Sequence, residues 1–157
     1  MKKCIFAGSF DPITLGHLDI IKRVSQLFDT VIVAVAEGKE NSAVRLDIVK
    51  KSTSGIKNVT AEVFDGMLVD YAKSKNVTTL IRGLRNSIDF EYEKHLAEIY
   101  RSQYKDLQVI YLISPPELCH VSSTAVREIA GYGGDLSGYV AIEALNEIKQ
   151  QYIIMKT

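Results

Sequence analysis

The sequence has few cysteines, no net charge and no long apolar run. Its two cysteines, Cys4 and Cys119, lie far apart and form no metal-binding or redox motif. The 19 basic and 19 acidic residues cancel, so bulk charge gives no reason to expect binding to nucleic acid or to an anionic membrane. Apolar runs such as residues 31–36 are too short to span a bilayer, and residues 1–3 lead into a strand without the apolar segment of a signal peptide. We therefore expect a soluble cytoplasmic protein that binds neither nucleic acid nor membranes.

The chain length and the alternation of apolar segments predict the fold. A chain of 157 residues suits one domain, which can bury about 70% of its unfolded surface without disulfides or metal. Short strand-like runs alternate with helix-like stretches, which favours a single doubly wound α/β domain, residues 1–157, around a five-stranded parallel sheet. Ligands of such sheets bind beyond the carboxyl ends of the strands. The expected strands are 4–7, 30–36, 59–64, 78–81 and 108–113, and the expected helices are 15–28, 43–52, 67–74, 87–104, 123–130 and 142–152.

The first strand-to-helix junction, residues 7–17, is the most informative segment. Unpaired N–H groups and the helix dipole favour an anion at a helix N-terminus, and His17 adds a side-chain donor there. The junction has neither the G-x-G-x-x-G pattern of dinucleotide-binding folds nor the G-x-x-x-x-G-K-[ST] pattern of Walker-type NTPases. Residues 14–17, Thr-Leu-Gly-His, instead resemble the T-x-G-H signature of the nucleotidyltransferase superfamily. The alternative is that backbone groups satisfy His17 and that its role is structural.

Two arginines follow the fourth expected strand. Arg82 leaves the strand at its end, and Gly83 allows Arg85 to turn back to the same side. Guanidinium groups suit phosphate oxygens because each offers a planar fork of donors and remains charged. In the alternative interpretation, the two arginines are solvated and pair with Asp89 or Glu91.

A glutamate and a run of hydroxyl residues complete the candidate site. The dipole of the fourth helix explains Glu93 less well than the acidic residues before it, so Glu93 is a candidate ligand contact. Residues 122–124, Ser-Ser-Thr, stand where the fifth helix begins, and capping accounts for only one of their hydroxyls. Three hydroxyls with unpaired amides can bind a triphosphate. Arg127, one turn later, either joins them or pairs with Glu128.

Four motifs, taken in order, resemble the bacterial phosphopantetheine adenylyltransferase family. They are Ser9 to His17, Arg82-Gly83-Leu84-Arg85, Asp89-Phe90-Glu91-Tyr92-Glu93 and Val121-Ser122-Ser123-Thr124. The T-x-G-H and [IV]-S-S-[ST] elements mark only the superfamily, whereas R-G-L-R followed by D-F-E-Y-E is much more specific to this family. The resemblance implies a Rossmann-like domain, a homohexamer and the transfer of AMP from ATP to 4′-phosphopantetheine with the help of Mg²⁺. The products would be dephospho-coenzyme A and pyrophosphate.

The resemblance also implies a role for individual residues. The catalytic residues would be His17, Arg85 and Ser123, and His17 would bind the α-phosphate in the transition state. The acceptor is already a phosphate anion, so an in-line displacement would need alignment and charge stabilisation but no general base. The substrate 4′-phosphopantetheine would contact Ser9, Lys39, Met67, Leu68 and Arg82. The ATP contacts would be Ser9, Phe10, His17, Gly83, Leu84, Arg85, Glu93, Leu118, Cys119, His120, Val121, Ser122, Ser123 and Thr124.

The chain departs from the family pattern at several places, one of them Ala7, which stands where proline is usual. Ser9 stands where threonine is usual and keeps the hydroxyl. The loop of residues 37–42 is short and lacks the usual paired lysines, so either Lys39 or Asn41 occupies the position of the substrate lysine. We expect Lys39, whose flexible ammonium can reach a phosphate. Residues 118–120 replace a stretch that is often aromatic and hydroxyl-bearing.

Two other functions are compatible with parts of the sequence. A nucleotidyltransferase that uses nicotinamide mononucleotide or a cytidylyl donor would share His17 and the serine cluster. A non-catalytic nucleotide-binding module on the same fold is disfavoured because His17, Arg82 and Arg85 are all present. Assays with different acceptors distinguish these functions.

Overall fold

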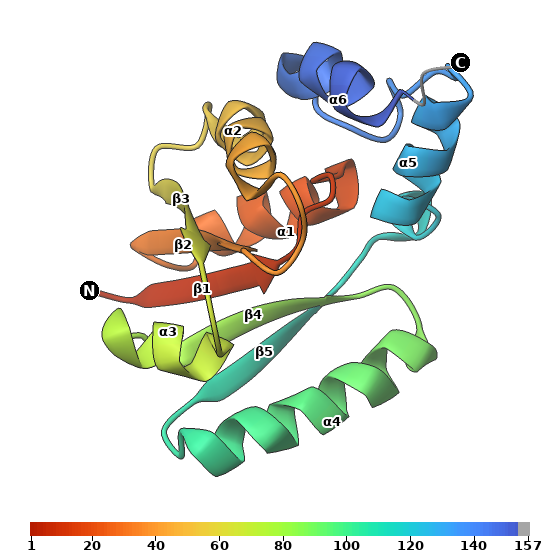
Figure 1. Cartoon of the computed structure of the whole chain (residues 1–157). Coiled ribbons are helices and arrows are strands. Elements are labelled where there is room, and N and C mark those ends of the chain that lie inside the picture. Colours follow the sequence, from red (N-terminus) through yellow and green to blue (C-terminus); the bar gives the residue numbers. More distant parts are fainter. Residues whose placement is uncertain (154–157) are drawn as a thin grey trace.

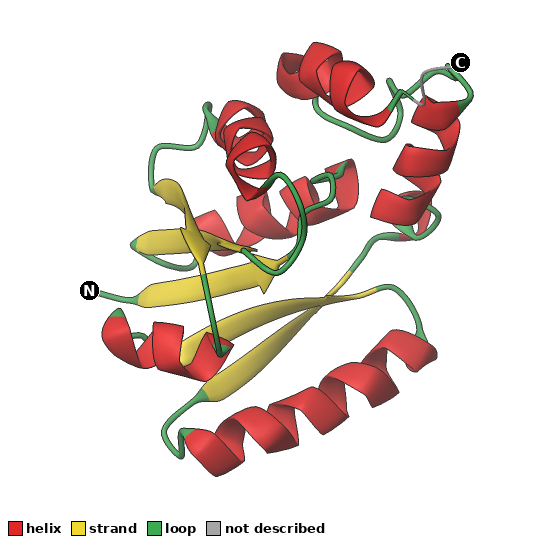
Figure 2. Ribbon diagram, viewed as in Figure 1, coloured by secondary structure: helices red, strands yellow, loops and turns green. Residues whose placement is uncertain are grey.

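The computed structural model describes residues 1–153, which fold around one parallel five-stranded sheet with helices on both faces (Figure 1) (Figure 2). This arrangement confirms the predicted doubly wound α/β fold. The strands are β1 (Lys3–Gly8), β2 (Thr30–Ala36), β3 (Val59–Phe64), β4 (Thr79–Leu84) and β5 (Gln108–Ile113). The helices are α1 (Leu15–Ser25), α2 (Ser42–Thr53), α3 (Leu68–Ser74), α4 (Ser87–Gln103), α5 (Ser123–Gly131) and α6 (Leu145–Tyr152), with 3₁₀ turns η1 (Pro116–Leu118) and η2 (Ile142–Ala144).

The strand order places β1 at the centre of the sheet. The order is β3-β2-β1-β4-β5, and β1 pairs in parallel with β2 on one side and with β4 on the other. Along the chain, β2 and then β3 follow on one side of β1, whereas β4 and then β5 follow on its other side. Ligands of such folds bind in the crevice at this switch point, outside the carboxyl ends of the strands. The site is therefore expected where β1 and β4 end.

Each face of the sheet packs on its own hydrophobic core. Successive residues of a strand point to opposite faces, so Cys4 and Phe6 join the core beneath α1, α2, α5 and α6, whereas Ile5 and Ala7 join the core beneath α3. Figure 1 shows the same division, with α1 and α2 on one side of the sheet and α3 and α4 on the other. The two cores anchor the central strands from both faces.

The fourth strand is longer than predicted. Residues 82–84 continue β4 and pair with residues 111–113 of β5. The prediction that Arg82 lies at the end of the strand is therefore wrong, and Arg85 is the arginine that lies beyond it. The strand can continue through a charged residue because Arg82 forms an ion pair with Glu93 of α4.

Two helices also differ from the sequence-based ranges. The first helix ends at Ser25 and not at residue 28, and the backbone carbonyls of Ser25 and Phe28 accept hydrogen bonds from the Asn58 amide at 2.8 and 2.9 Å. The last expected helix, 142–152, begins with the turn η2 before α6. Within residues 1–153, no helix has the length and apolar character needed to cross a bilayer.

Candidate functional site

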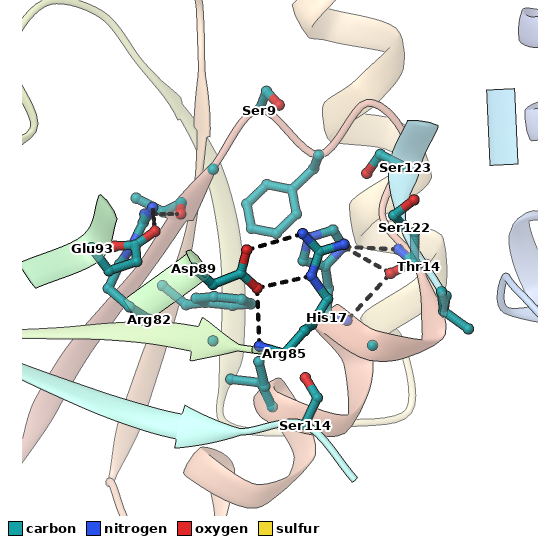
Figure 3. Close-up of a pocket in the computed structure, with 18 of the residues that line it drawn as sticks. Ser9, Thr14, His17, Arg82, Arg85, Asp89, Glu93, Ser114, Ser122 and Ser123 are labelled. Carbon is teal, nitrogen blue, oxygen red and sulfur yellow. Dashed lines mark hydrogen bonds and ion pairs between the residues drawn. The ribbon is translucent and has the colours of Figure 1, made fainter. Parts of the chain in front are cut away.

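A cavity of about 440 Å³ opens at the carboxyl ends of β1 and β4 (Figure 3). Its walls come from the three segments that the sequence singled out: the β1–α1 junction, the end of β4 with the start of α4, and the N-terminus of α5. The prediction that these segments converge is confirmed. The predicted residues that line the cavity are Ser9, Phe10, His17, Arg82, Gly83, Arg85, Glu93, Val121, Ser122, Ser123 and Thr124.

His17 is held at the N-terminus of α1 by a reciprocal cap with Thr14. The Thr14 hydroxyl accepts a hydrogen bond from the His17 backbone N–H, and the Thr14 N–H donates to His17 Nδ1 at 3.0 Å. Because Nδ1 accepts a hydrogen bond, the proton of the neutral ring lies on Nε2. Burial, together with the nearby Arg85 and Arg82, lowers the pKa of His17 to about 4. The structural interpretation is supported because one ring nitrogen completes the cap, whereas the functional interpretation stays a prediction, for which Nε2 remains as a neutral donor.

Arg82 and Glu93 form a buried ion pair in the wall of the cavity. Arg82 donates to the carboxylate from Nε at 2.7 Å and from Nη2 at 2.6 Å, and its Nη1 donates to the Ala7 carbonyl at 2.9 Å. The side chains of Arg82 and Glu93 are only 19% and 10% exposed. Neither Asp89 nor Glu91 is the partner of Arg82, so that part of the alternative interpretation is wrong. The pair also explains why an acidic residue stands at position 93, beyond the first turn of α4.

Arg85 and Asp89 form a second, more exposed ion pair. Arg85 Nε lies 3.0 Å from Asp89 Oδ2, and Nη2 lies 3.2 Å from Oδ1. The hydrogen bonds from Arg85 hold the pKa of Asp89 below its usual value. Figure 3 shows this pair beside His17 and well apart from the Arg82–Glu93 pair. The cavity thus offers two separate guanidinium groups, one buried and one accessible.

The hydroxyls at the start of α5 bind protein groups. Ser122 caps the helix by accepting from the Ala125 N–H at 3.1 Å, and Ser123 donates to the Pro12 carbonyl at 2.7 Å. Thr124 accepts from Arg127 Nη2 at 3.3 Å. Capping therefore explains one hydroxyl, as predicted, and the Ser123 bond ties α5 to the β1–α1 loop.

Arg127 pairs with Asp11 and not with Glu128. Its Nη1 lies 3.6 Å from Asp11 Oδ2 and also donates to the Asp11 carbonyl. Asp11 accepts a further hydrogen bond from the Tyr152 hydroxyl of α6 at 2.6 Å. The β1–α1 loop is therefore joined to both α5 and α6.

Several predicted contacts lie outside the described lining of the cavity. Leu84 and Leu68 are buried, each 8% exposed, whereas Met67 is exposed. Leu118 belongs to η1. The remaining two residues of that loop are held by protein groups: Cys119 Sγ lies 3.5 Å from the Pro115 carbonyl, and the His120 ring packs edge-to-face on Tyr139.

Lys39 also lies outside the lining, but it points to the β1–α1 loop. Its Nζ lies 3.5 Å from Asp11 Oδ2. Asn41 has φ of 57° at the start of α2, and its side chain makes no capping hydrogen bond. Lys39 is thus the residue of this loop whose cation is directed to the β1–α1 loop.

Sequence reasoning missed Arg45, which is 1% exposed on α2. It donates to four backbone carbonyls, one of them that of Ser9. A signal was present, because Arg45 shares the helical spacing of the buried residues Ile48 and Val49. A charged residue in such an apolar pattern indicates a buried polar contact.

The described residues do not form a metal cage. Within residues 1–153, no group of three or more His, Cys, Asp and Glu side chains is placed to hold a metal ion. The carboxylates of Asp89 and Glu93 in the cavity wall are both paired with arginines. The chemistry of the cavity is that of an anion site, with guanidinium groups, a histidine donor and helix N-termini.

Comparisons with known proteins agree with this chemistry. The family model of the cytidylyltransferase-like proteins matches residues 5–129. Phosphopantetheine adenylyltransferase of Shouchella clausii is 39% identical over 97% of this chain and 99% of its own length, and that of Rubrobacter xylanophilus is 41% identical over 97% and 96%. The crystal structure of a putative nicotinate-nucleotide adenylyltransferase from Vibrio parahaemolyticus superposes with a TM-score of 0.75 over 100% of this chain and 98% of its own, at 20% identity, and so shares the fold. The chain belongs to the phosphopantetheine adenylyltransferase family of the cytidylyltransferase-like proteins.

Proposed function

We propose that the protein transfers AMP from ATP to 4′-phosphopantetheine, which yields dephospho-coenzyme A and pyrophosphate. The observation that carries this proposal is the convergence of His17, Arg82, Arg85 and the N-terminus of α5 on one cavity in a chain of this family. The cavity has many hydrogen-bond donors, and its carboxylates are neutralised. These properties suit two substrates that both present phosphate.

Catalysis rests on alignment and on stabilisation of charge. The acceptor phosphate attacks the α-phosphorus of ATP while pyrophosphate leaves on the opposite side, and no proton has to be removed from the acceptor. His17 Nε2–H donates to a non-bridging oxygen of the α-phosphate as charge develops there. The ring is neutral at physiological pH because its pKa is about 4, so it serves as a fixed donor that needs no reorganisation.

The two arginines serve different substrates in this mechanism. Arg82, fixed against Glu93 and the Ala7 carbonyl, retains N–H donors for the acceptor phosphate. Arg85 is more exposed and stands beside His17, so it binds the phosphates of the nucleotide with Ser123. Ser9 donates to phosphates of both substrates. Lys39 supports the acceptor phosphate from the second loop, after exchange of its contact with Asp11.

The remaining contacts follow the same division. ATP passes along the N-terminal end of α5 and the loop before it. The pantetheine arm runs toward α3. The further ATP contacts are Phe10, Gly83, Leu84, Glu93, Leu118, Cys119, His120, Val121, Ser122 and Thr124, and the further substrate contacts are Met67 and Leu68.

Mg²⁺ enters this proposal as part of the nucleotide substrate. Mg²⁺ commonly binds substrate phosphates and keeps several waters, which fits a cavity whose two carboxylates are engaged by arginines. The ion supplies additional charge neutralisation on the phosphates. We also propose that the reaction takes place in the cytoplasm.

A homohexamer is proposed for the assembly. Large apolar side chains are exposed along α4 and the edge strand β5, among them Ile88, Tyr92 and Ile113. An exposed apolar surface next to an edge strand is typical of a protein–protein contact. Sedimentation analysis of the purified protein tests this assembly.

The decisive experiment for the function measures pyrophosphate release from ATP. Addition of 4′-phosphopantetheine should start the reaction, whereas nicotinamide mononucleotide and phosphocholine should not. Turnover with either control acceptor and none with 4′-phosphopantetheine would assign the chain to another transfer reaction. Absence of turnover with all three acceptors, in a folded protein that binds ATP, would instead favour a non-catalytic binding module.

A further inference from the structure

Arg45 is a buried arginine without an acidic partner. It is 1% exposed, and among residues 1–153 it takes part in no ion pair with a carboxylate. The burial of a charge is unfavourable unless hydrogen bonds or an opposite charge compensate for it. Its contacts therefore have to explain why α2 carries an arginine on its core-facing side.

Four backbone carbonyls bind the guanidinium group. Nη2 donates to the carbonyls of Ala36 at 3.0 Å and Lys39 at 2.8 Å, and Nε donates to that of Glu40 at 3.1 Å. Nη1 donates to the Ser9 carbonyl at 2.5 Å. The first three acceptors belong to the end of β2 and the loop that follows it, whereas Ser9 belongs to the loop after β1. One side chain thus joins the two loops.

The joined loops carry two of the proposed phosphate contacts. Ser9 lines the cavity, and Lys39 extends from the second loop to within 3.5 Å of Asp11. Both backbones are bonded to the same rigid, planar group. Arg45 consequently limits the separation of the Ser9 and Lys39 backbones, from which the two side chains extend. Arg45 itself is not among the described lining residues of the cavity.

We infer that Arg45 is a positioning residue for the acceptor phosphate: it holds the Ser9 and Lys39 backbones in one arrangement and thereby preorganises the site. The inference rests on the proposed function, because it assigns Ser9 and Lys39 to the phosphate of 4′-phosphopantetheine. Preorganisation of this kind is sensitive to small displacements, and a shift of about 1 Å in a binding group can reduce activity by about 100-fold.

The test compares Arg45→Lys and Arg45→Gln with Ile48→Ala. Lysine keeps the positive charge, but its ammonium is a compact point charge on a flexible stem and lacks the planar fork that reaches both loops. We expect both Arg45 variants to raise the KM for 4′-phosphopantetheine by about 10- to 100-fold. The KM for ATP should rise less, because Ser9 serves both substrates whereas Lys39 serves only the acceptor. Ile48, fully buried one turn along the same helix, touches neither loop through a hydrogen bond. Its replacement by alanine should lower Tm and leave both KM values unchanged.

A purely structural role gives a different result. The inference would be overturned if Arg45→Lys lowered the Tm and the fraction of folded enzyme but left both KM values unchanged. An equal rise of both KM values would also overturn it. Calorimetric titration of folded Arg45→Lys with 4′-phosphopantetheine measures the affinity without turnover, and wild-type affinity would also overturn it. The wild-type protein is assayed first. Absence of turnover with 4′-phosphopantetheine would refute the proposed function. Normal wild-type turnover together with wild-type KM values in the Arg45 variants would refute the positioning role alone.

Discussion

Gly83 lies directly against Ile20 in the wall of the cavity: a Cβ atom at position 83 would come within 2.2 Å of Ile20 Cδ1. Ile20 belongs to α1, the helix that His17 begins, and Gly83 follows Arg82 in β4. The lack of a side chain at position 83 therefore brings the helix that presents the histidine close to the strand that presents the buried arginine.

This close approach predicts a coupling between the two positions. Gly83→Ala should lower the free energy of unfolding by about 1–3 kcal/mol, because the added methyl group overpacks the contact. Ile20→Val removes Cδ1 and should cost about 0.5–1.5 kcal/mol by itself. In the double variant the cost of Gly83→Ala should shrink, since the clashing atom is gone. Urea unfolding of the four proteins measures this coupling, and strictly additive losses would contradict the packing argument.

His17→Ala should lower kcat by about 10²- to 10³-fold, as the loss of one transition-state donor typically does. The affinity for ATP should remain nearly unchanged, because the mechanism uses this donor on charge that develops in the reaction. Steady-state kinetics and calorimetric ATP binding check both statements. Turnover close to wild type in a folded variant would rule out this role of His17.

The lowered pKa of His17 predicts a pH dependence of stability. The folded chain takes up the His17 proton only near pH 4, whereas the ordinary value is 6.5. Between these values the unfolded chain binds the proton and the folded chain does not, so the free energy of unfolding falls as the pH falls through this window. His17→Gln removes the titration and should flatten the decline of Tm between pH 6.5 and 4. Equal slopes for wild type and variant would show that other groups cause the decline.

Arg82→Ala and Arg85→Ala should separate the two substrates. The loss of Arg82 should lower mainly the affinity for 4′-phosphopantetheine, and the loss of Arg85 should lower mainly the affinity for ATP. Calorimetric titration of each variant with each ligand measures both affinities. Arg82→Ala should also lower Tm more, because it leaves the buried Glu93 carboxylate without its partner. Equal losses of both ligands in both variants would refute the division.

Lys39 and Asn41 can be distinguished by a matched pair of variants. Lys39→Ala should raise the KM for 4′-phosphopantetheine, because its ammonium lies near the β1–α1 loop. Asn41→Ala is the control in the same loop and should leave this KM unchanged. A change in KM or kcat only in the Asn41 variant would reassign the contact, and no change in either would remove it from this loop.

Most of the sheet was predictable because apolar runs end at polar or turn-forming residues. The bounds of β2, β3 and β5 agree with the sequence-based ranges. The end of β4 was not predictable in this way, since a charged residue inside a strand reads as its boundary. Arg82 continues the strand only because Glu93, 11 residues later on another element, pairs with it. A run of neighbouring residues does not contain that information.

The sequence predicted which segments form the candidate site better than it predicted the hydrogen bonds between them. The motifs placed His17 and Arg85 at the cavity, because a helix N-terminus and a strand end fix a position in this fold. The bonds of Ser123 to Pro12 and of Arg127 to Asp11 depend on how α5 docks against the first loop. These bonds join residues more than a hundred positions apart. Local sequence patterns therefore do not predict this docking.

The hydrogen bond from Tyr152 to Asp11 links the start of the chain to its last described helix, over a separation of 141 residues. All described residues that line the cavity precede position 125, so they are translated well before this tyrosine. A nascent chain therefore contains all the described lining residues of the cavity while the first loop still lacks one of its anchors. The docking of α6 on the first loop therefore follows the synthesis of every described residue that lines the cavity.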